Sequence, residues 1–595
     1  MKHKDRFVFG RTARSVFRTM LSVVLLLCSI LFLPGVTADV SAQTLAADAT
    51  SKIVTSTAEV TISNVTKVPE GKSIDWATYQ VLYATYDAGS NALEYHLTDW
   101  ARTVLVGTGT TGTGTTEEAA IKEITGLTKT ETGATEQSDL VNRLAAATKI
   151  PYTAASWSVR GTDVVADLPV GAYLVIPSCE GMTFLNMLVS VDTSGTIDTA
   201  DNGWVLTAKG AVLKGKTLSI DKKITGKNGS TPVAISVGKT TETAQIGDKI
   251  HYTIVAQVPH YPDNSAVKTF KVVDTPTNLS ILTDSISVSG VKTDGTETAI
   301  AAISYAVSQD SANGPVTIDF SDSYNGTFYN TTEKSWPYVS VKITYTAVVT
   351  EAAKIGTEGN PNTAKLIYRI DTQEKELPSP KTTVFTYGLN VVKLEAGTEA
   401  GTEAKKLTNA VFQISRDVNE TPTPLYFKDN ADGSYTLAQD QTTAASTTGY
   451  TKDLKTQGTD GSFLLKGLDA RVDYSLKEVK APSGYSVNTD TLTIRLTAKT
   501  NPDDSTYTGI LQEVTGTEKD KNDQVIATDA GSWKCGLLDA DKAKAAVSLT
   551  DTKLFELPAT GGKGTDGFAR NGILLLTAAA LVYGISRRKK QDERG

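Results

Sequence analysis

The chain has 595 residues, 40% hydrophobic and 21% charged, so it can bury several cores, and ordinary domain sizes indicate about three domains. Its formal net charge of −7, with no basic stripe and interleaved aromatic residues in the body of the chain, argues against a nucleic-acid partner. His96, His251 and His260 have no ligand-spaced cysteine or acidic companions, so we assign no metal and no cofactor.

The N-terminal segment is typical of a secretory signal peptide. A basic start is followed by an apolar run over 20–33 and by the small-residue exit Val40-Ser41-Ala42, which predicts removal of residues 1–42. The alternative, a membrane anchor, would need a run of about 20 apolar residues. Removal leaves Cys179 and Cys535, far apart in sequence, so stability outside the cell has to come from large cores or from another covalent device.

The mature chain reads as short alternating strands separated by turn residues, such as "AEVTISNV", "KIHYTIVAQV" and "DTLTIRLTA". This period of two predicts an all-β protein built from antiparallel sandwiches. Helical patterns are few, and the best lie at 116–124 and 138–148 in the first third. New strands begin after short linkers near 215 and 388, which predicts domains over 43–215, 216–387 and 388–556.

Several strands of the middle domain place a polar residue on their apolar face. In "LSIDKKI", Lys222 shares a face with Leu218, Ile220 and Ile224, because alternate residues of a strand point the same way. The same counting turns Asp274 of "FKVVD" and Asn362 of "NTAKLIY" inward. The middle domain thus supplies one inward lysine, one inward acid and one inward amide.

The last domain repeats this pattern with a different third member. Lys393 shares a face with Leu389 and Val391, Glu478 belongs to the inward face of "YSLKE", and Asp551 follows the inward residues of "VSLTD". The three inward residues are therefore a lysine and two acids.

An isolated buried charge is costly, so each group of three must be neutralised, paired or reacted. The plain alternatives are a buried ion pair or a strand end that reaches solvent. Burial lowers the pKa of a lysine and raises that of a carboxylic acid, so a neutral amine can attack the side-chain carbonyl of Asn362 or Asp551. Asp274 and Glu478 would then promote the reaction as proton donors and carriers, and the product is an internal isopeptide bond.

The C-terminus contains three parts in order. "LPATGG" begins at residue 557, an uncharged, mostly apolar segment covers 572–585, and a basic cluster follows at 587–590. A plain membrane anchor would explain the second and third parts, with the basic cluster staying cytoplasmic. A plain membrane anchor would not explain the "LPATGG" motif.

These three parts resemble the cell-wall sorting signal of Gram-positive surface proteins, here residues 557–595. The resemblance implies that a sortase attacks the Thr560 carbonyl, cuts before Gly561 and passes the acyl group to an amine. The segment 572–585 would then be a temporary membrane stop that is absent from the mature chain. The motif residues are Leu557, Pro558, Ala559, Thr560 and Gly561.

Other motifs resemble domains of pilins and adhesins. "YSLKEVKAPSGY" (474–485) and "FLLKGLD" resemble Cna B-type domains, while "GDKIHYTI", "FKVVDTP" and "GNPNTAKLIY" resemble the Cna A-like second domain of fimbrial isopeptide proteins. The first domain resembles pilin N-terminal domains more loosely. The resemblance implies tandem immunoglobulin-like sandwiches with Lys222–Asn362 and Lys393–Asp551 crosslinks. Members often carry Asn in the last strand, so Asp551 is a departure, and this bond would release water instead of ammonia.

Pilus shaft subunits of this type also need an acceptor lysine near the end of the first domain. In "WVLTAKGAVLKGK" (204–216), Lys214 lies nearest the expected place, with Lys209 and Lys216 as alternatives. The Tyr-Pro pair of the family motif is missing. Three solvated linker lysines are the plain alternative.

The favoured hypothesis is a sortase-assembled major pilin on the Gram-positive cell surface, anchored to peptidoglycan. Its Thr560 would be joined to a lysine of the next copy in a head-to-tail, open-ended polymer. The alternative is a monomeric wall-anchored adhesin that binds a host ligand, and minor pilins are further possible partners. No nucleophile and base pair or paired-carboxylate motif predicts an enzyme, beyond the self-directed crosslinking and the role of sortase substrate.

Overall fold

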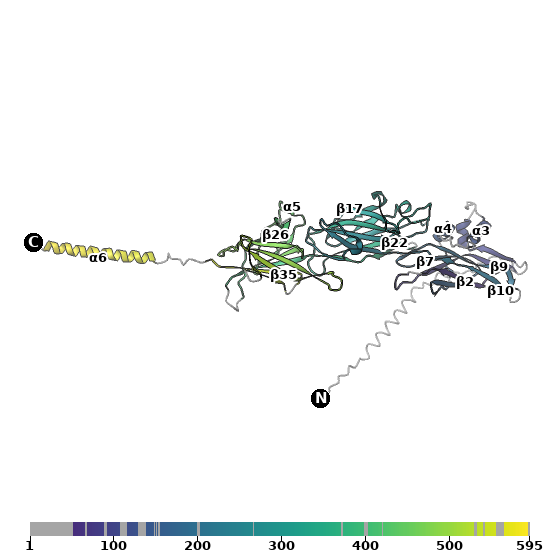
Figure 1. Ribbon diagram of the computed structural model, residues 1–595, viewed down its shortest axis with the longest axis horizontal. Helices are drawn as coiled ribbons and strands as arrows, with labels where there is room; N and C mark the ends of the chain where they lie inside the picture. Colours follow the sequence, from purple (N-terminus) through teal and green to yellow (C-terminus); the bar gives the residue numbers. More distant parts are fainter. Residues whose placement is uncertain are drawn as a thin grey trace, which may run out of the picture.

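The computed structural model describes residues 51–592, except 66–67, 88–91, 108–115, 129–138, 148, 150, 153–154, 199–202, 264, 266, 371–372, 398–402, 419–420, 529–531, 539–541 and 555–563. Figure 1 shows three β-domains in a row, with a long helix, α6, beyond the third. The predicted signal peptide and the sorting motif at 557–561 lie outside the described residues.

The first domain combines sheets with a small helical cover. Its helices are α2 (Asp99–Leu105), α3 (Glu117–Thr128) and α4 (Asp139–Ala146). Its strands are β1 (Ser51–Ile53), β2 (Thr57–Ser63), β3 (Asp75–Asp87), β4 (Ala92–Leu97), β5 (Ser158–Arg160), β6 (Asp163–Pro169), β7 (Gly171–Ser178), β8 (Met182–Phe184), β9 (Met187–Asp198), β10 (Gly203–Lys209), β11 (Ala211–Val212) and β12 (Gly215–Thr217).

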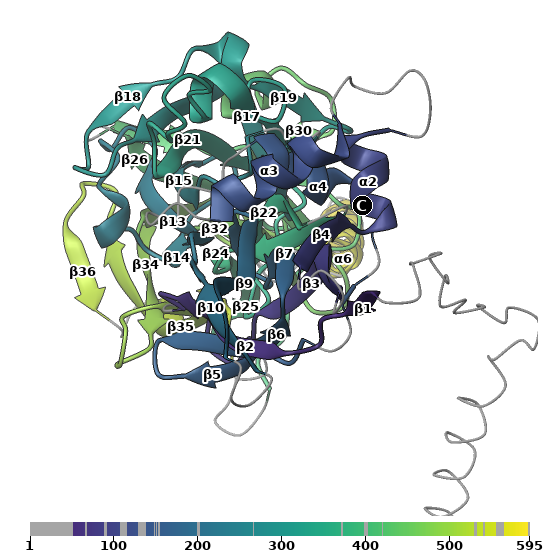
Figure 2. The ribbon, with the colours of Figure 1, turned by 90° about the vertical axis from the view of Figure 1, so that its right-hand side faces the viewer.

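The two faces of the main sheet of this domain, β1-β3-β7-β9-β10 with β4, bury different partners. One face packs against the sheet β11-β2-β6-β5, and alternate apolar residues of β2 such as Val60 and Ile62 are fully buried there. The other face is covered by α2, α3 and α4, which lie together on one side of the domain in Figure 2. The predicted helices at 116–124 and 138–148 correspond to α3 and α4, whereas α2 was not predicted.

The second domain is a sandwich of two sheets, β13-β15-β21-β17-β18 and β14-β24-β22-β16-β20-β19, with β23 beside β22. Its short helical turns are η1 (Ile235–Val237), η2 (Ala302–Ser304) and η3 (Tyr324–Phe328). Its strands are β13 (Ile220–Lys227), β14 (Thr241–Thr243), β15 (Lys249–Gln257), β16 (Lys271–Pro276), β17 (Leu279–Val291), β18 (Glu297–Ala299), β19 (Ala306–Gln309), β20 (Val316–Asp319), β21 (Ser340–Val349), β22 (Asn360–Ile370), β23 (Gln373–Pro378) and β24 (Thr382–Phe385).

The third domain is a second sandwich, of β30-β28-β29-β32-β25-β38-β37 against β27-β26-β33-β34-β35-β36, with β31 beside β26. It contains one short helix, α5 (Gln441–Ala444). Its strands are β25 (Tyr387–Glu395), β26 (Val411–Val418), β27 (Thr421–Pro424), β28 (Phe427–Asp429), β29 (Ser434–Leu437), β30 (Tyr450–Thr451), β31 (Leu454–Lys455), β32 (Ser462–Leu468), β33 (Asp473–Lys480), β34 (Thr491–Thr500), β35 (Tyr507–Lys519), β36 (Val525–Thr528), β37 (Trp533–Leu537) and β38 (Lys544–Asp551).

The sheets change close to the predicted domain boundaries. The strand β12 pairs with β8, so the first domain runs to Thr217, two residues beyond the predicted boundary. At the second boundary, β24 still belongs to the second domain, and β25 begins the third at Tyr387. The pairing of β12 depends on a strand more than thirty residues earlier, which local patterns do not reveal.

The C-terminal helix α6 (Gly564–Asp592) contains the predicted temporary membrane segment 572–585. Among the helices of the described residues, α6 included, none is both long and apolar enough to cross a membrane. A temporary membrane stop at 572–585 stays a prediction.

Candidate crosslink sites

The core of the second domain encloses the three polar residues that the strand pattern turns inward. Lys222 lies in β13 of one sheet, while Asp274 in β16 and Asn362 in β22 lie in the facing sheet. Because Asn362 is opposite Pro276, two residues after Asp274, the acid and the amide share the inward face of adjacent strands. The three residues are 0%, 1% and 0% exposed.

The contacts in this site run from the lysine to the amide through an acid and a tyrosine. The Nζ of Lys222 lies 2.6 Å from Oδ1 of Asp274. The hydroxyl of Tyr345, in β21, donates to the other oxygen of Asp274 and accepts a 3.0 Å hydrogen bond from Nδ2 of Asn362. The Oδ1 atom of Asn362 is buried and has no hydrogen-bond partner among the described residues.

Aromatic rings surround the lysine of this site. The rings of Tyr252 and Tyr345 stack with centroids 5.3 Å apart, and Nζ of Lys222 lies 5.3 and 5.8 Å from those centroids. Burial lowers the pKa of Lys222 to about 8, although the carboxylate of Asp274 opposes the shift. Burial also raises the pKa of Tyr345, so its hydroxyl keeps its proton. The lysine can therefore reach its neutral, nucleophilic form far more easily than a solvated lysine can.

The third domain builds an equivalent site with a different strand arrangement. Lys393 in β25 and Asp551 in β38 lie on neighbouring parallel strands of one sheet, and Glu478 in β33 faces them from the other sheet. Lys393 is level with Leu549, so Asp551 lies two residues farther along on the same face. The side chains of Lys393, Glu478 and Asp551 are 0%, 0% and 1% exposed.

In this site the lysine lies between two acids. Its Nζ is 2.9 Å from Oε1 of Glu478 and hydrogen-bonds Oδ1 of Asp551. The other oxygen of Glu478 accepts a 2.9 Å hydrogen bond from the backbone N–H of Asn488. Oδ2 of Asp551 is buried and finds no hydrogen-bond partner in the described part of the chain. The ring of Phe412 closes the site, with its centroid 5.6 Å from Nζ.

Burial raises the pKa of Glu478 and of Asp551, and the positive charge of Lys393 opposes both shifts. The two acids therefore keep their protons more readily in this buried space than they would in water. A neutral lysine beside a protonated carboxyl is the pair that can condense to an amide. Both sites thus have the composition required for an internal crosslink: a buried amine, a buried carbonyl carbon and an acid between them.

Two residues of these sites were not predicted from the sequence. Tyr345, which bridges Asp274 and Asn362, lies on the inward face of "VKITYTAVV", so its strand pattern could have found it. Asn488 acts through its backbone in a loop between β33 and β34, and no sequence pattern marks such a contact.

The three predicted acceptor lysines lie near the junction of the first and second domains. Lys214 is exposed between β11 and β12, and its carbonyl accepts a hydrogen bond from Leu185. Lys209 ends β10, and Lys216 lies in β12, where burial lowers its pKa. The positions of these three lysines do not distinguish the acceptor, so the choice of Lys214 as acceptor stays a prediction.

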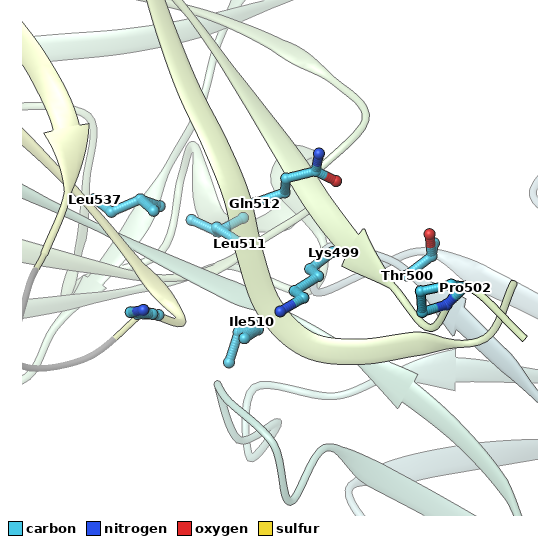
Figure 3. Close-up of a pocket in the computed structure, with 8 residues that line it drawn as sticks. Lys499, Thr500, Pro502, Ile510, Leu511, Gln512 and Leu537 are labelled. Atoms are coloured by element: carbon cyan, nitrogen blue, oxygen red, sulfur yellow. The ribbon is translucent and has the colours of Figure 1, made fainter.

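A pocket of about 510 Å³ in the third domain lies away from these sites. Figure 3 shows its lining, which joins the ends of β34 and β35 to Leu537 of β37. The lining is aliphatic and lysine-bearing, with Ile510, Leu511 and Lys499 as typical members. None of the predicted site residues lines it.

Comparisons with known proteins address the third domain and the C-terminus. Residues 396–509 match the family model of the prealbumin-like fold domain called SpaA, and residues 550–592 match the model of the LPXTG cell wall anchor motif. The first match contains Glu478, and the second contains Asp551 and the predicted sorting motif.

Whole-chain relatives are more distant. The chain is 26% identical over 540 residues to the trypsin-resistant surface T6 protein of Streptococcus pyogenes serotype M6, covering 81% of this chain and 92% of that protein. Among solved structures, the T6 backbone pilin of the same serotype shows 17% identity and a TM-score of 0.48 over 84% of this chain and 99% of its own. The full-length major pilin SpaD of Corynebacterium diphtheriae shows 17% identity and a TM-score of 0.41, over 84% and 98%.

The C-terminal anchor match confirms the predicted sorting signal, and the SpaA match lies within the predicted third domain, 388–556. The anchor match makes this chain a cell-wall-anchored surface protein, and over most of its length it is similar to the T6 surface protein.

Proposed function

We propose that this chain is the shaft subunit of a covalently polymerised pilus, stiffened by internal isopeptide bonds in its second and third domains. The observation that carries the proposal is the pair of buried lysine-centred sites, one in each of two successive sandwiches, on a chain that ends in a cell-wall anchor. The naming of two relatives as backbone or major pilins points the same way.

In the second domain the neutral Nζ of Lys222 attacks Cγ of Asn362. Asp274 holds the proton that the amine gives up, and passes it to the leaving amide nitrogen. The bond between Cγ and Nδ2 breaks, ammonia leaves, and an amide joins β13 to β22. The hydroxyl of Tyr345 holds the amide group and the acid in register during this exchange.

In the third domain Lys393 attacks Cγ of Asp551, and Glu478 carries the proton to the departing oxygen. One water leaves, and an amide joins the parallel strands β25 and β38. The chain acts on itself once at each site and turns over no substrate.

Intact mass measures both bonds directly. Together these two bonds should lower the mass of the folded protein by one ammonia and one water, with linked peptides that contain Lys222 with Asn362 and Lys393 with Asp551. A full calculated mass in folded protein would refute the internal bonds.

For the external bond, we propose that sortase joins Thr560 of one copy to Lys214 of the next. Such a head-to-tail contact repeats without closing, as a fibre requires. Cell-wall extracts probed by immunoblot should show a ladder of high-mass species that disappears in Lys214→Ala and persists in the matched variants Lys209→Ala and Lys216→Ala. A ladder lost only in one of these two would move the acceptor to that lysine.

The same blot tests the monomeric adhesin as the second candidate. A single wall-linked band at monomer mass in the unmodified strain, with the sortase present, would exclude the shaft and leave an anchored adhesin. Loss of wall attachment in Thr560→Ala is expected under either function, and it controls for the sorting signal itself.

A further inference from the structure

The second and third domains meet in one continuous hydrophobic core. The core cluster runs from Leu218 to Leu549, whereas the cores of the first domain are separate from it. At the joint, Ile246 donates a 2.9 Å backbone hydrogen bond to the carbonyl of Gly467. Gly467 has φ +91°, and a Cβ there would lie 2.2 Å from Ile246 Cδ1. The two domains are therefore in contact at the backbone, with no room for a side chain at Gly467.

This joint contains a third lysine between two acids. The Nζ of Lys227, at the end of β13, lies 2.5 Å from Oδ2 of Asp469, just after β32, and 3.9 Å from Oδ2 of Asp248. The side chains of Asp469, Asp248 and Lys227 are 0%, 7% and 19% exposed. Lys227 belongs to the second domain and Asp469 to the third, so this pair spans the joint.

Asp469 shares a specific feature with the carbonyl groups of the two sites above. Its Oδ1 is buried without a hydrogen-bond partner in the described residues, as are Oδ1 of Asn362 and Oδ2 of Asp551. The fully buried Tyr474 lies against it, since its hydroxyl accepts a 2.9 Å hydrogen bond from the backbone N–H of Asp469. One oxygen of this carboxyl group is therefore paired with Lys227, while the other is buried without a polar partner in the described residues.

The acid beside the pair is suited to carry a proton. Burial raises the pKa of Asp248, and the charge of Asp469 adds to the shift, while Lys227 opposes it. Backbone and side-chain donors from Gln245 and Asn228 hold the carboxyl of Asp248 in place.

The other charges of the joint are matched among themselves. Arg471 lies 2.5 Å from Glu242 and donates a 3.0 Å hydrogen bond to Thr243. Lys239 lies 3.6 Å from the same glutamate. Besides the two acids, Lys227 donates to the carbonyl of Thr243 at 3.1 Å. The set Lys227, Asp248 and Asp469 is thus a unit of one amine and two acids, the same composition as the site in the third domain.

We propose that Lys227 and Asp469 form an amide bond that joins the second domain to the third. The neutral Nζ attacks Cγ of Asp469, the bond from Cγ to the protonated oxygen breaks, and one water leaves. Asp248 accepts the proton of the amine and returns it to the departing oxygen, so no oxidant or further reactant is needed. This inference rests on the crosslinking chemistry proposed above, and it would make the joint covalent at a second point besides the main chain.

The side chain of Lys227 is 19% exposed, against 0% for Lys222 and Lys393, so solvent shields its amine from Asp469 more than in the other two sites. We therefore expect this bond to form more slowly than the other two. The mature protein should be incubated until the linked fraction stops rising before its mass is read.

The test is intact mass and peptide mapping of the mature protein. We expect a deficit of one ammonia and two waters in total, and a linked peptide pair that contains Lys227 and Asp469. Lys227→Arg keeps the positive charge and the ion pair but cannot form the amide, so its deficit should lack one water while its fold is retained. Asp469→Asn should lose ammonia in place of water, so the crosslinked variant should have the same mass as the crosslinked natural protein.

Absence of the Lys227–Asp469 linked pair after incubation would overturn the inference. The linked peptides of Lys222 and Lys393 are read in the same spectrum. If those two are present and the third is absent, only the bond at the joint fails. If all three are absent, the crosslinking chemistry of the proposed function fails with it.

Discussion

The proposed crosslink sites of the second and third domains differ in the number of protons that their reactive forms hold. In the second domain, Lys222 faces a single acid, Asp274, and its proposed target, Asn362, is an amide. The reactive form, a neutral amine beside a protonated acid, holds one titratable proton. In the third domain, Lys393 faces two acids, and its proposed target, Asp551, is one of them. The reactive form then holds two protons, one on Glu478 and one on Asp551.

The difference shows what the replacement of Asn by Asp changes. A carboxyl target must be protonated to lose water, so the third site depends on burial to raise the pKa of both acids. The second site needs its target in no special protonation state. The two proposed products are the same kind of amide, so the sites should differ in how the bond forms and much less in what the bond stabilises.

The largest effects are expected from removing the lysines. Lys222→Met and Lys393→Met each remove a bond across a long loop, worth about 3–5 kcal/mol by analogy with a disulfide. Lys393→Met also leaves two buried acids without a cation, whereas Lys222→Met leaves one, and an unpaired buried charge costs about 3–5 kcal/mol. Calorimetry should therefore show a larger loss in the unfolding transition of the third domain than in that of the second.

Lys223→Met and Lys477→Met are matched controls, because these lysines lie next to the site residues on the opposite faces of β13 and β33. They are expected to change the free energy of unfolding by at most about 0.5 kcal/mol. Equal, small losses from all four variants would contradict the presence of either bond.

The next largest effect concerns the rate of bond formation. Asp274→Asn and Glu478→Gln keep the shape of each acid but remove its proton-carrying ability, which is worth about 10²–10⁴ in rate. Each variant should fold and show the full sequence mass in its own domain, while the other domain keeps its deficit. A normal deficit in the altered domain would show that the acid is not needed.

The two sites should also respond differently to pH. In the second domain, the pair of Lys222 and Asp274 loses its last proton as the pH rises through about 8, the pKa of Lys222. The rate of bond formation should therefore be level below that pH and fall roughly tenfold per pH unit above it. The reactive form of the third site needs a proton on both acids, so its rate should fall from a lower pH, as Glu478 and Asp551 lose their protons. Unlinked, denatured chains would be refolded at several pH values and quenched. Their masses would then give the rate of bond formation in each domain as a function of pH. Coincident curves would contradict the difference in proton number.

The smallest effect on stability is expected for Asp551→Asn, which gives the third site the chemistry of the second. Lys–Asn and Lys–Asp crosslinks are the same amide, so the linked variant and the linked natural protein should have identical masses. Their free energies of unfolding should agree within about 0.5 kcal/mol. Only the pH curve should move, toward that of the second domain. A variant that stays unlinked would show that the site is built for an acid.

Much of both sites was visible in the sequence, because a strand alternates strictly and an inward charge stands out against apolar neighbours. Lys222, Asp274, Asn362, Lys393, Glu478 and Asp551 all have buried side chains on the predicted faces. The helix α2 was missed because its seven residues are too few to show a clear helical period. The partner of each lysine was inferred from resemblance, since counting along one strand says nothing about which strand faces it.

By itself, the sequence determined the all-β class, the order of the domains, the inward lysines and acids, and the sorting signal. All of these follow from local periodicity or from a contiguous motif. Only the tertiary structure decided that Tyr345 bridges Asp274 to Asn362, and that Lys227 of one domain lies against Asp469 of the next. These contacts join residues 17 to 242 positions apart, and their geometry depends on how whole sheets pack. The alternation of one strand predicts a buried charge, but the packing of the sheets determines which residue pairs with it.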